Sequence, residues 1–267
     1  MVSGEASSEL AVEGGSQRVR LSFLGTGSAL PTGHRVQSGV LVEAPDCEPL
    51  LIDCGSGVLH RLAGTPLGYE ALDDVLLTHH HVDHVADLLP LVKAKWLAGS
   101  ESLRVVGPPG TQAFVDALID AHGYMAGRLS LEITEVGPER FAHAGYSIAA
   151  HETVHSMYCQ AYRLETETGT VTVSGDSEAD EGLARFAEGS DVLIHDCSFP
   201  DDIDVANHPT PTQLARTLAG LDVGRLFLTH LYPQTVGRHE EMLEAVRSHY
   251  DGAVQIASEG QSVSVGN

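Results

Sequence analysis

The chain has 267 residues, of which 42% are apolar, and this is enough to bury the core of one large domain. Its 37 acidic residues outnumber the 15 basic ones and give a formal charge of -22, which excludes binding through a broad basic surface. No apolar run approaches the roughly 18 residues needed to cross a bilayer, so we expect no contact with a membrane.

Lysine is nearly absent, because only Lys93 and Lys95 are lysines and the other basic residues are arginines. The acidity has two explanations, a cationic partner or adaptation to high salt. We favour a halophilic protein, because molar salt shortens the Debye length to about 3 Å and screens the self-repulsion of an acidic surface. An anionic protein can still bind an anionic substrate under those conditions, so RNA and phosphoesters stay open as substrates.

Residues 1–18 contain three glutamates and lack the apolar segment of a secretory signal. They predict a disordered acidic tail. The cysteines show no CxxC spacing, so we expect reduced thiols and a cytoplasmic protein. These cysteines are Cys47, Cys54, Cys159 and Cys197.

Strands are predicted where alternating or continuous apolar runs end at glycine, proline or polar residues. In chain order these runs are 18–24, 38–43, 49–53, 74–77, 103–106, 130–134, 147–150, 160–165, 170–174, 192–194, 225–228 and 254–257. Helical patterns occur at 57–62, 111–121, 181–188, 212–221 and 240–249. No repeat or linker divides the chain, so we predict two sheets with helices outside them in one domain, residues 19–267. The strand at 254–257 is expected to close this fold.

Residues 78–90, THHHVDHVADLLP, follow a predicted strand and lead into a helix. Such a run is either a metal-ligand cluster or a chance group on a solvated turn. Imidazole and carboxylate together favour zinc, manganese or iron over a soft copper site. The spacing therefore makes candidate ligands of His79, His81, Asp83 and His84.

Three more candidate ligands stand at the ends of later strands, at His155, Asp176 and His230. Each has a structural alternative, since an aspartate can cap a turn and a histidine can bond to a backbone carbonyl. As a set with the earlier cluster they predict a centre with two divalent metal ions, zinc first, with manganese or iron as alternatives.

These motifs resemble the metallo-β-lactamase superfamily, and within it the ribonuclease Z-like branch. The resemblance covers residues 19 to about 260, and the spacing of seven residues before Tyr162-Arg163 selects His155 over His151. The matching segments are Phe23 to Gly27, Asp53-Cys54-Gly55, His79 to His84, Gly175-Asp176-Ser177 and Leu226 to His230.

The resemblance implies an α+β fold, a four-layer αββα sandwich with the metals at one edge between the sheets. It assigns His79, His81 and His155 to one metal, and Asp83, His84 and His230 to the other. Asp176 would bridge the two ions, and Asp53 would orient a ligating imidazole. Two cations about 3.5–4 Å apart can share a hydroxide and clamp both oxygens of a phosphoester.

Further motifs of the nuclease branch point to phosphodiester chemistry, and Asp83 is expected to act beside the nucleophile. His195-Asp196 stands where that branch has a histidine–acid pair, and His208-Pro209-Thr210 where it has a histidine that contacts the scissile phosphate. His208 could stabilise the phosphorane or protonate the leaving group, with Asp196 orienting it. The alternative is that His208 only begins a helix. Arg35 is a candidate phosphate contact or a plain surface arginine.

The chain departs from the tRNA 3′-end endonucleases in lacking the long Gly- and Pro-rich arm between His84 and His155. It also lacks the Lys and Asn of their P-x-K-x-R-N loop and their S-x-R-Y segment after His230. We therefore expect a binuclear metallo-hydrolase that acts as a ribonuclease, trimming RNA ends rather than cutting folded tRNA.

Two alternatives stand beside this hypothesis. One keeps the site but takes a small phosphodiester, such as a cyclic nucleotide or a phosphonate-pathway ester, or an aryl sulfate. The other is a metal-bound interaction protein without catalysis, which the complete ligand set disfavours. Relatives are often homodimers, and Trp96 is either part of such an interface or a core residue.

Overall fold

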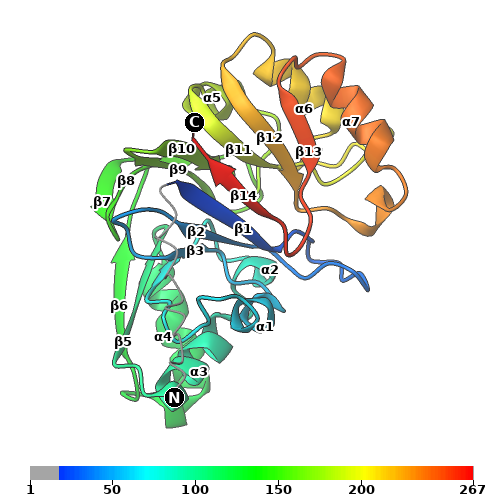
Figure 1. Cartoon of the computed structure of the whole chain (residues 1–267). Helices are drawn as coiled ribbons and strands as arrows, with labels where there is room; N and C mark the ends of the chain where they lie inside the picture. The colour runs from blue at the N-terminus through cyan, green and yellow to red at the C-terminus, as the bar shows by residue number, and fades with distance from the viewer. Residues whose placement is uncertain (1–17, 267) are drawn as a thin grey trace, which may run out of the picture.

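The computed structural model describes residues 18–266, and in these residues the chain forms two seven-stranded sheets (Figure 1). The predicted acidic tail, apart from Arg18, lies outside the described residues. The first sheet has the order β14-β1-β2-β3-β4-β5-β6. Its strands are β1 (Val19–Gly25), β2 (Gly39–Glu43), β3 (Leu50–Ile52), β4 (Asp74–Leu76), β5 (Ser102–Gly107), β6 (Ser130–Glu135) and β14 (Ser262–Val265).

The second sheet repeats this organisation, with the order β13-β12-β11-β10-β9-β8-β7. Its strands are β7 (Arg140–His143), β8 (Tyr146–Glu152), β9 (Gln160–Thr166), β10 (Gly169–Val173), β11 (Ser190–Asp196), β12 (Val223–Thr229) and β13 (Ala253–Ile256). In each sheet an antiparallel half is followed by a parallel half, β3 to β6 in the first and β10 to β13 in the second. Parallel strands end at the same edge, so residues that follow them are brought together.

Helices cover the outer face of each sheet, which completes the four layers seen in Figure 1. The first sheet carries α1 (Val58–Ala63), α2 (Val82–Val85), α3 (Leu88–Ala98), α4 (Thr111–Ala121) and the short 3₁₀ turn Gly123–Met125. The second carries α5 (Glu181–Phe186), α6 (Pro211–Leu218), α7 (His239–Arg247) and the turn Pro233–Thr235. The predicted α+β sandwich is thereby confirmed. No helix within residues 18–266 is long and apolar enough to span a membrane.

The central core lies between the two sheets. Strand alternation sends one set of side chains inward and the next set toward the helices. In β11, for example, Val192 and Ile194 join the inter-sheet cluster while Leu193 packs under the helices. Phe23 and Phe227 meet across the central core with ring centroids 5.1 Å apart.

The structure contains two strands that the sequence patterns did not predict, β7 and β14, and it places the helix expected after the histidine cluster in two parts, α2 and α3. Helix α3 is apolar on most sides, and its Pro90 lies in the first turn, where the missing N–H has no intrahelical partner to lose. Strands β7 and β14 are only four residues long. The prediction that residues 254–257 close the fold is wrong, because β14 follows and pairs antiparallel with β1.

Trp96 lies on α3, where it packs partly buried against the outer core of the first sheet. The Lys93 ammonium lies 3.8 Å from the centroid of its ring, and the Arg128 guanidinium 5.2 Å. These contacts agree with the core alternative for Trp96, and the homodimer stays a prediction.

Replacing Phe227 with alanine is expected to lower the free energy of unfolding by about 3–5 kcal/mol, because it opens a cavity between the sheets. Urea unfolding followed by circular dichroism measures this change. The control is Val236→Ala at a side chain that is 65% exposed, for which we expect a change below about 0.5 kcal/mol. Equal effects of both variants would contradict the central position of Phe227.

Candidate metal centre

All seven predicted metal ligands meet at one edge of the sandwich. They follow β4, β8, β10 and β12 or lie on α2, and these segments all reach the same edge. The donor atoms fall into two groups, each within 4.8 Å. The first group is His79, His81, His155 and Asp176, and the second is Asp83, His84 and His230.

The first group has the dimensions of a tetrahedral metal site. His81 Nδ1 lies 3.0 Å from His79 Nε2 and 3.1 Å from His155 Nε2. Asp176 Oδ2 lies 3.7 Å from the Nε2 atoms of His79 and His155. Metal–ligand bonds of about 2.0–2.1 Å in a tetrahedron imply donor separations of about 3.3 Å. The four donors therefore fit around one ion after small adjustments.

The second group shares Asp176 with the first. His230 Nε2 lies 3.1 Å from Asp83 Oδ2 and 3.4 Å from Asp176 Oδ2. His84 Nε2 lies 3.3 Å from Asp176 Oδ1. Asp176 thus reaches both groups of imidazoles, which is the arrangement required of a bridging carboxylate.

Hydrogen bonds to oxygen acceptors fix the outward nitrogens of two of these imidazoles. The Nδ1 of His84 lies 2.6 Å from Asp53 Oδ2, and that of His155 lies 3.3 Å from the Asn207 carbonyl oxygen. Carboxylates and carbonyls only accept, so each Nδ1 donates. The Nε2 atoms then turn their lone pairs inward, as metal ligands must.

Two hydroxyl groups fix the other outward nitrogens. Thr78 Oγ1 donates to Asp53 and lies 3.0 Å from His79 Nδ1. Ser198 Oγ donates to Asp196 Oδ1 at 2.6 Å and lies 2.9 Å from His230 Nδ1. Because each hydroxyl has already donated its hydrogen, it accepts from the imidazole. The predicted orienting role of Asp53 thus extends through Thr78 to a second histidine.

Two donor atoms of the second group are buried without a hydrogen-bond partner, His84 Nε2 and Asp176 Oδ1. They face each other at 3.3 Å. Two buried acceptors at this distance require either a shared proton or a cation between them, because an unsatisfied buried polar atom is costly. The residues therefore fit a divalent cation.

The electrostatics of the two imidazole groups differ. Burial lowers the pKa of His79 well below its usual range, and lowers the pKa of His81 and His155 as well. Burial also opposes charge on His84, but Asp176 and Asp53 outweigh it and raise the pKa of His84 well above its usual value. The carboxylates of the second group therefore favour a positive charge between them.

The backbone is strained at two points of the centre. Asp53 and His230 both have left-handed conformations, with φ of 60° and 57°, which cost about 1–3 kcal/mol each. The surrounding structure holds them. Asp53 accepts from the Thr78 amide at 2.8 Å, and the Leu231 amide next to His230 donates to the Thr26 carbonyl at 3.0 Å. These turns aim both side chains into the cluster.

His208 and Asp196 are adjacent to the second group of ligands. His208 Nδ1 lies 2.7 Å from Asp196 Oδ2, and its ring stacks on His230 with centroids 5.2 Å apart. Burial opposes protonation of His208, but Asp196 raises its pKa above the usual value. His208 also begins no helix itself, since Thr210 is the N-cap of α6.

Two predicted site residues are not brought to the cluster. His195 precedes Asp196 in β11, so strand alternation directs it toward the helical side, and its Nδ1 donates to the Asp196 carbonyl at 2.7 Å. Arg35 donates from Nη1 to the Ala257 carbonyl at 2.8 Å and to Thr26. Neither residue lines the cavity above the donors.

That cavity has a volume of about 260 Å³ and is lined by several residues that sequence reasoning missed. Burial and the nearby carboxylates of Asp176, Asp83 and Asp196 raise the pKa of Tyr232 to about 12, so its phenol stays a donor. The sequence offered one signal for Tyr232, its place two residues after His230. The missed lining residues are Ala29, Val82, Ser156, Asn207 and Tyr232.

Comparison with known proteins agrees with this architecture. A family model described as a beta-lactamase superfamily domain matches residues 49–231. A ribonuclease Z of Mycobacterium bovis (strain BCG / Pasteur 1173P2) is 29% identical over 277 residues, covering 92% of this chain and 98% of that protein. The probable metallo-hydrolase YhfI of Bacillus subtilis (strain 168) is 30% identical over 250 residues, covering 91% of this chain and 98% of that protein.

Solved structures show the same fold. The crystal structure of YhfI from Bacillus subtilis superimposes with a TM-score of 0.80 at 29% identity, covering 92% of this chain and 99% of that one. The short form of human tRNase Z superimposes with a TM-score of 0.73 at 21% identity, covering 92% and 99%.

Asp53→Asn is expected to lower the affinity for divalent metal by about 10- to 100-fold, the usual effect of removing a group that orients ligating imidazoles. Competition with a chromophoric chelator measures the affinity. The matched control is Asp116→Asn on the exposed side of α4, which should leave it unchanged. An unchanged affinity in Asp53→Asn would contradict the role of the Asp53 bonds to His84 and Thr78.

Metal loading is expected to release protons, and the affinity is expected to fall as the pH falls. The pKa values of His84 and His230 are raised. At any pH below these pKa values, protons compete with the cation for the two imidazoles. Titration calorimetry in buffers of different ionisation enthalpy measures the release. If no protons are released near pH 7, the second group does not bind the ion.

Proposed function

The chain belongs to the family described as the beta-lactamase superfamily domain, and we propose that it is a metal-dependent phosphodiester hydrolase that acts on RNA. The convergence of seven histidine and aspartate donors on Asp176, beside His208 at an open cavity, carries this proposal. Relatives named ribonuclease Z that align over 92% of this chain support it.

In this proposal the two donor groups would hold two divalent ions, and Asp176 would be shared between the two groups. Such ions supply the positive charge that activates a water molecule and polarises a phosphodiester. Zinc is the first assignment, since imidazole and carboxylate donors in a tetrahedral arrangement suit it, and manganese or iron are the alternatives. The fit of the donors and the unpartnered His84 Nε2 support metal binding without deciding between these ions.

His208 and Asp196 supply proton chemistry in this proposal. Asp196 is fully buried and receives the His208 Nδ1 hydrogen, so the His208 Nε2 is left for the substrate. A His208 protonated at Nε2, with Nδ1 held by Asp196, can donate to a phosphoryl oxygen or to the leaving alkoxide. Asp83 lines the same cavity and would orient the attacking water. His195 and Arg35 stay predictions without a contact to this cavity.

A small phosphodiester is the second candidate substrate. Within the described part of the chain, no lysine or arginine lines the cavity above the donors. Long RNA, in contrast, is usually bound by several cationic side chains on its phosphates. This observation favours a substrate with few phosphates, either a cyclic nucleotide or the end of an RNA chain. It disfavours binding of a folded RNA through many phosphate contacts.

Three finer predictions stay with this proposal. The free state of all four cysteines supports a reducing compartment, which we propose to be the cytoplasm. The charge of -22 supports adaptation to high salt. The homodimer is proposed from the resemblance alone.

Hydrolysis of end-labelled RNA, cyclic nucleotides and bis-p-nitrophenyl phosphate by the metal-loaded protein tests the function. We expect Asp83→Ala to abolish turnover of the accepted substrates, and His208→Gln to lower kcat by about 10²- to 10⁴-fold. The control is His122→Gln at an exposed histidine after α4. The proposal fails if the loaded protein turns over none of these diesters, or if Asp83→Ala remains active.

A further inference from the structure

A second cavity adjoins the metal centre on the far side of His208. Its volume is about 350 Å³, within the range of small-molecule sites. His208 lines both this cavity and the one above the donors, so the two share a wall. A ligand that passes over His208 would place one of its groups in each cavity.

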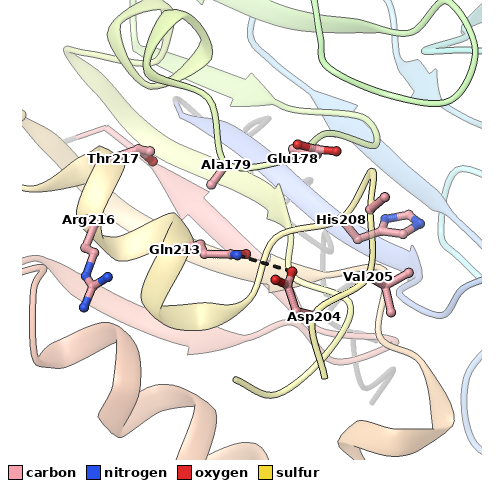
Figure 2. A pocket seen from close by; sticks show the side chains of 9 residues that line it. Glu178, Ala179, Asp204, Val205, His208, Gln213, Arg216 and Thr217 are labelled. Carbon is pink, nitrogen blue, oxygen red and sulfur yellow. Dashed lines mark hydrogen bonds between the residues drawn. The ribbon is translucent and has the colours of Figure 1, made fainter. Parts of the chain in front are cut away.

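The two ends of this cavity carry different groups, as Figure 2 shows. His208 lies at one end, and the α6 residues Arg216 and Thr217 lie at the other. Arg216 is exposed, and within residues 18–266 its guanidinium has no hydrogen bond or ion pair. In a chain with 37 acidic and 15 basic residues, an unpaired arginine among the residues that line a cavity is a candidate anion site.

Between these ends the cavity presents carboxylates. Glu178 uses one oxygen to accept from the Asn207 amide at 2.8 Å, and Asp204 uses one to accept from Gln213 Nε2 at 3.3 Å. The second oxygen of each has no partner among the described residues. Carboxylates repel a phosphate and accept hydrogen bonds from hydroxyl groups. The middle of the cavity therefore suits a neutral sugar.

From one end of the cavity to the other, the order of a histidine, two carboxylates and an arginine matches one ribonucleotide unit of an RNA chain. We propose that the cavity holds the nucleoside next to the scissile phosphate, with its 2′-hydroxyl at the carboxylates of Glu178 and Asp204 and the following phosphate at Arg216. The assignment rests on the proposed function, because it places the scissile phosphate on the His208 side. It deepens that function by assigning a substrate with two adjacent phosphates and a 2′-hydroxyl, the group that distinguishes RNA from DNA.

Binding of nucleotides to the metal-loaded protein tests this subsite without relying on turnover. Calorimetry compares adenosine 3′,5′-bisphosphate, adenosine 5′-monophosphate and 2′-deoxyadenosine 3′,5′-bisphosphate. The bisphosphate should bind about tenfold more tightly than the monophosphate, the effect of one charge-assisted contact. The deoxy compound should bind several-fold more weakly than the ribo compound.

The matched variants are Arg216→Gln and Arg185→Gln. Arg185 is an exposed helical arginine on α5 that pairs with Glu181 at 2.6 Å and lines neither cavity. Arg216→Gln should remove the preference for the bisphosphate, and Arg185→Gln should keep it. The preference should weaken between about 0.1 M and about 1 M salt, because an exposed ion contact is screened.

Equal affinity for the monophosphate and bisphosphate, or equal losses in both variants, would overturn the subsite. Equal affinity for the ribo and deoxy compounds would overturn the placement of the ribose at the carboxylates. Turnover of bis-p-nitrophenyl phosphate separates this proposal from the function itself. It should be the same in Arg216→Gln and the unmodified protein, and a matching loss there would also overturn the subsite. If the unmodified protein turns over no diester but prefers the bisphosphate, the function fails and the subsite stands.

Discussion

The structure depends on one electrostatic constraint, which is a buried cluster of lone pairs with too few hydrogens between them. His84 Nε2 and Asp176 Oδ1 face each other at 3.3 Å without a hydrogen-bond partner. Both atoms are acceptors once His84 donates from Nδ1 to Asp53. Such an arrangement is unfavourable in a protein interior unless a proton or a cation lies between the acceptors. The cluster is therefore best explained as a site for positively charged ions.

The hydrogen bonds behind the imidazoles make this constraint persistent. Asp53, Thr78 and Ser198 act as fixed acceptors, directly or through a hydroxyl that has already donated. An imidazole that rotated to relieve the crowding would lose its outer bond and leave a second buried polar atom unsatisfied. The inter-sheet core, with Phe227 on the strand that leads to His230, holds the strand ends that carry these groups. Stability of the sandwich and geometry of the centre are thus connected through β12.

The acidic surface and the two cavities impose a further limit on the substrate. Among residues 18–266, the cavity above the donors has no lysine or arginine in its lining, and the neighbouring cavity has only Arg216. The binding energy for an anionic ester must then come mainly from the metal centre itself. In our proposal, a second adjacent phosphate would add binding energy through Arg216. A long polyanion would find few cationic contacts on this part of the molecule. The distribution of charge thus supports the proposed recognition of a chain end or of a small diester.

The sequence by itself predicted the two sheets with helices outside them and the seven candidate donors, because both leave short-range patterns in the chain. Strand and helix periods are short-range, and the spacing of His79, His81, Asp83 and His84 is typical of one family of metal sites. It did not reveal β7 or β14, which are too short to show a period, or that the chain ends by returning to β1. It also assigned His195 a role that the alternation of β11 directs away from the centre.

Only the tertiary structure decided which side chains stand behind the donors and which line the cavities. Ser198 supports His230 from 32 positions away, and Asn207 supports His155 from 52. Tyr232 is marked in the chain only by its place two residues after His230, and Arg216 carries no motif that marks it. Their places follow from how strands ending at one edge, and the helix beside them, pack against each other, and contacts between distant residues leave no local periodicity to be read.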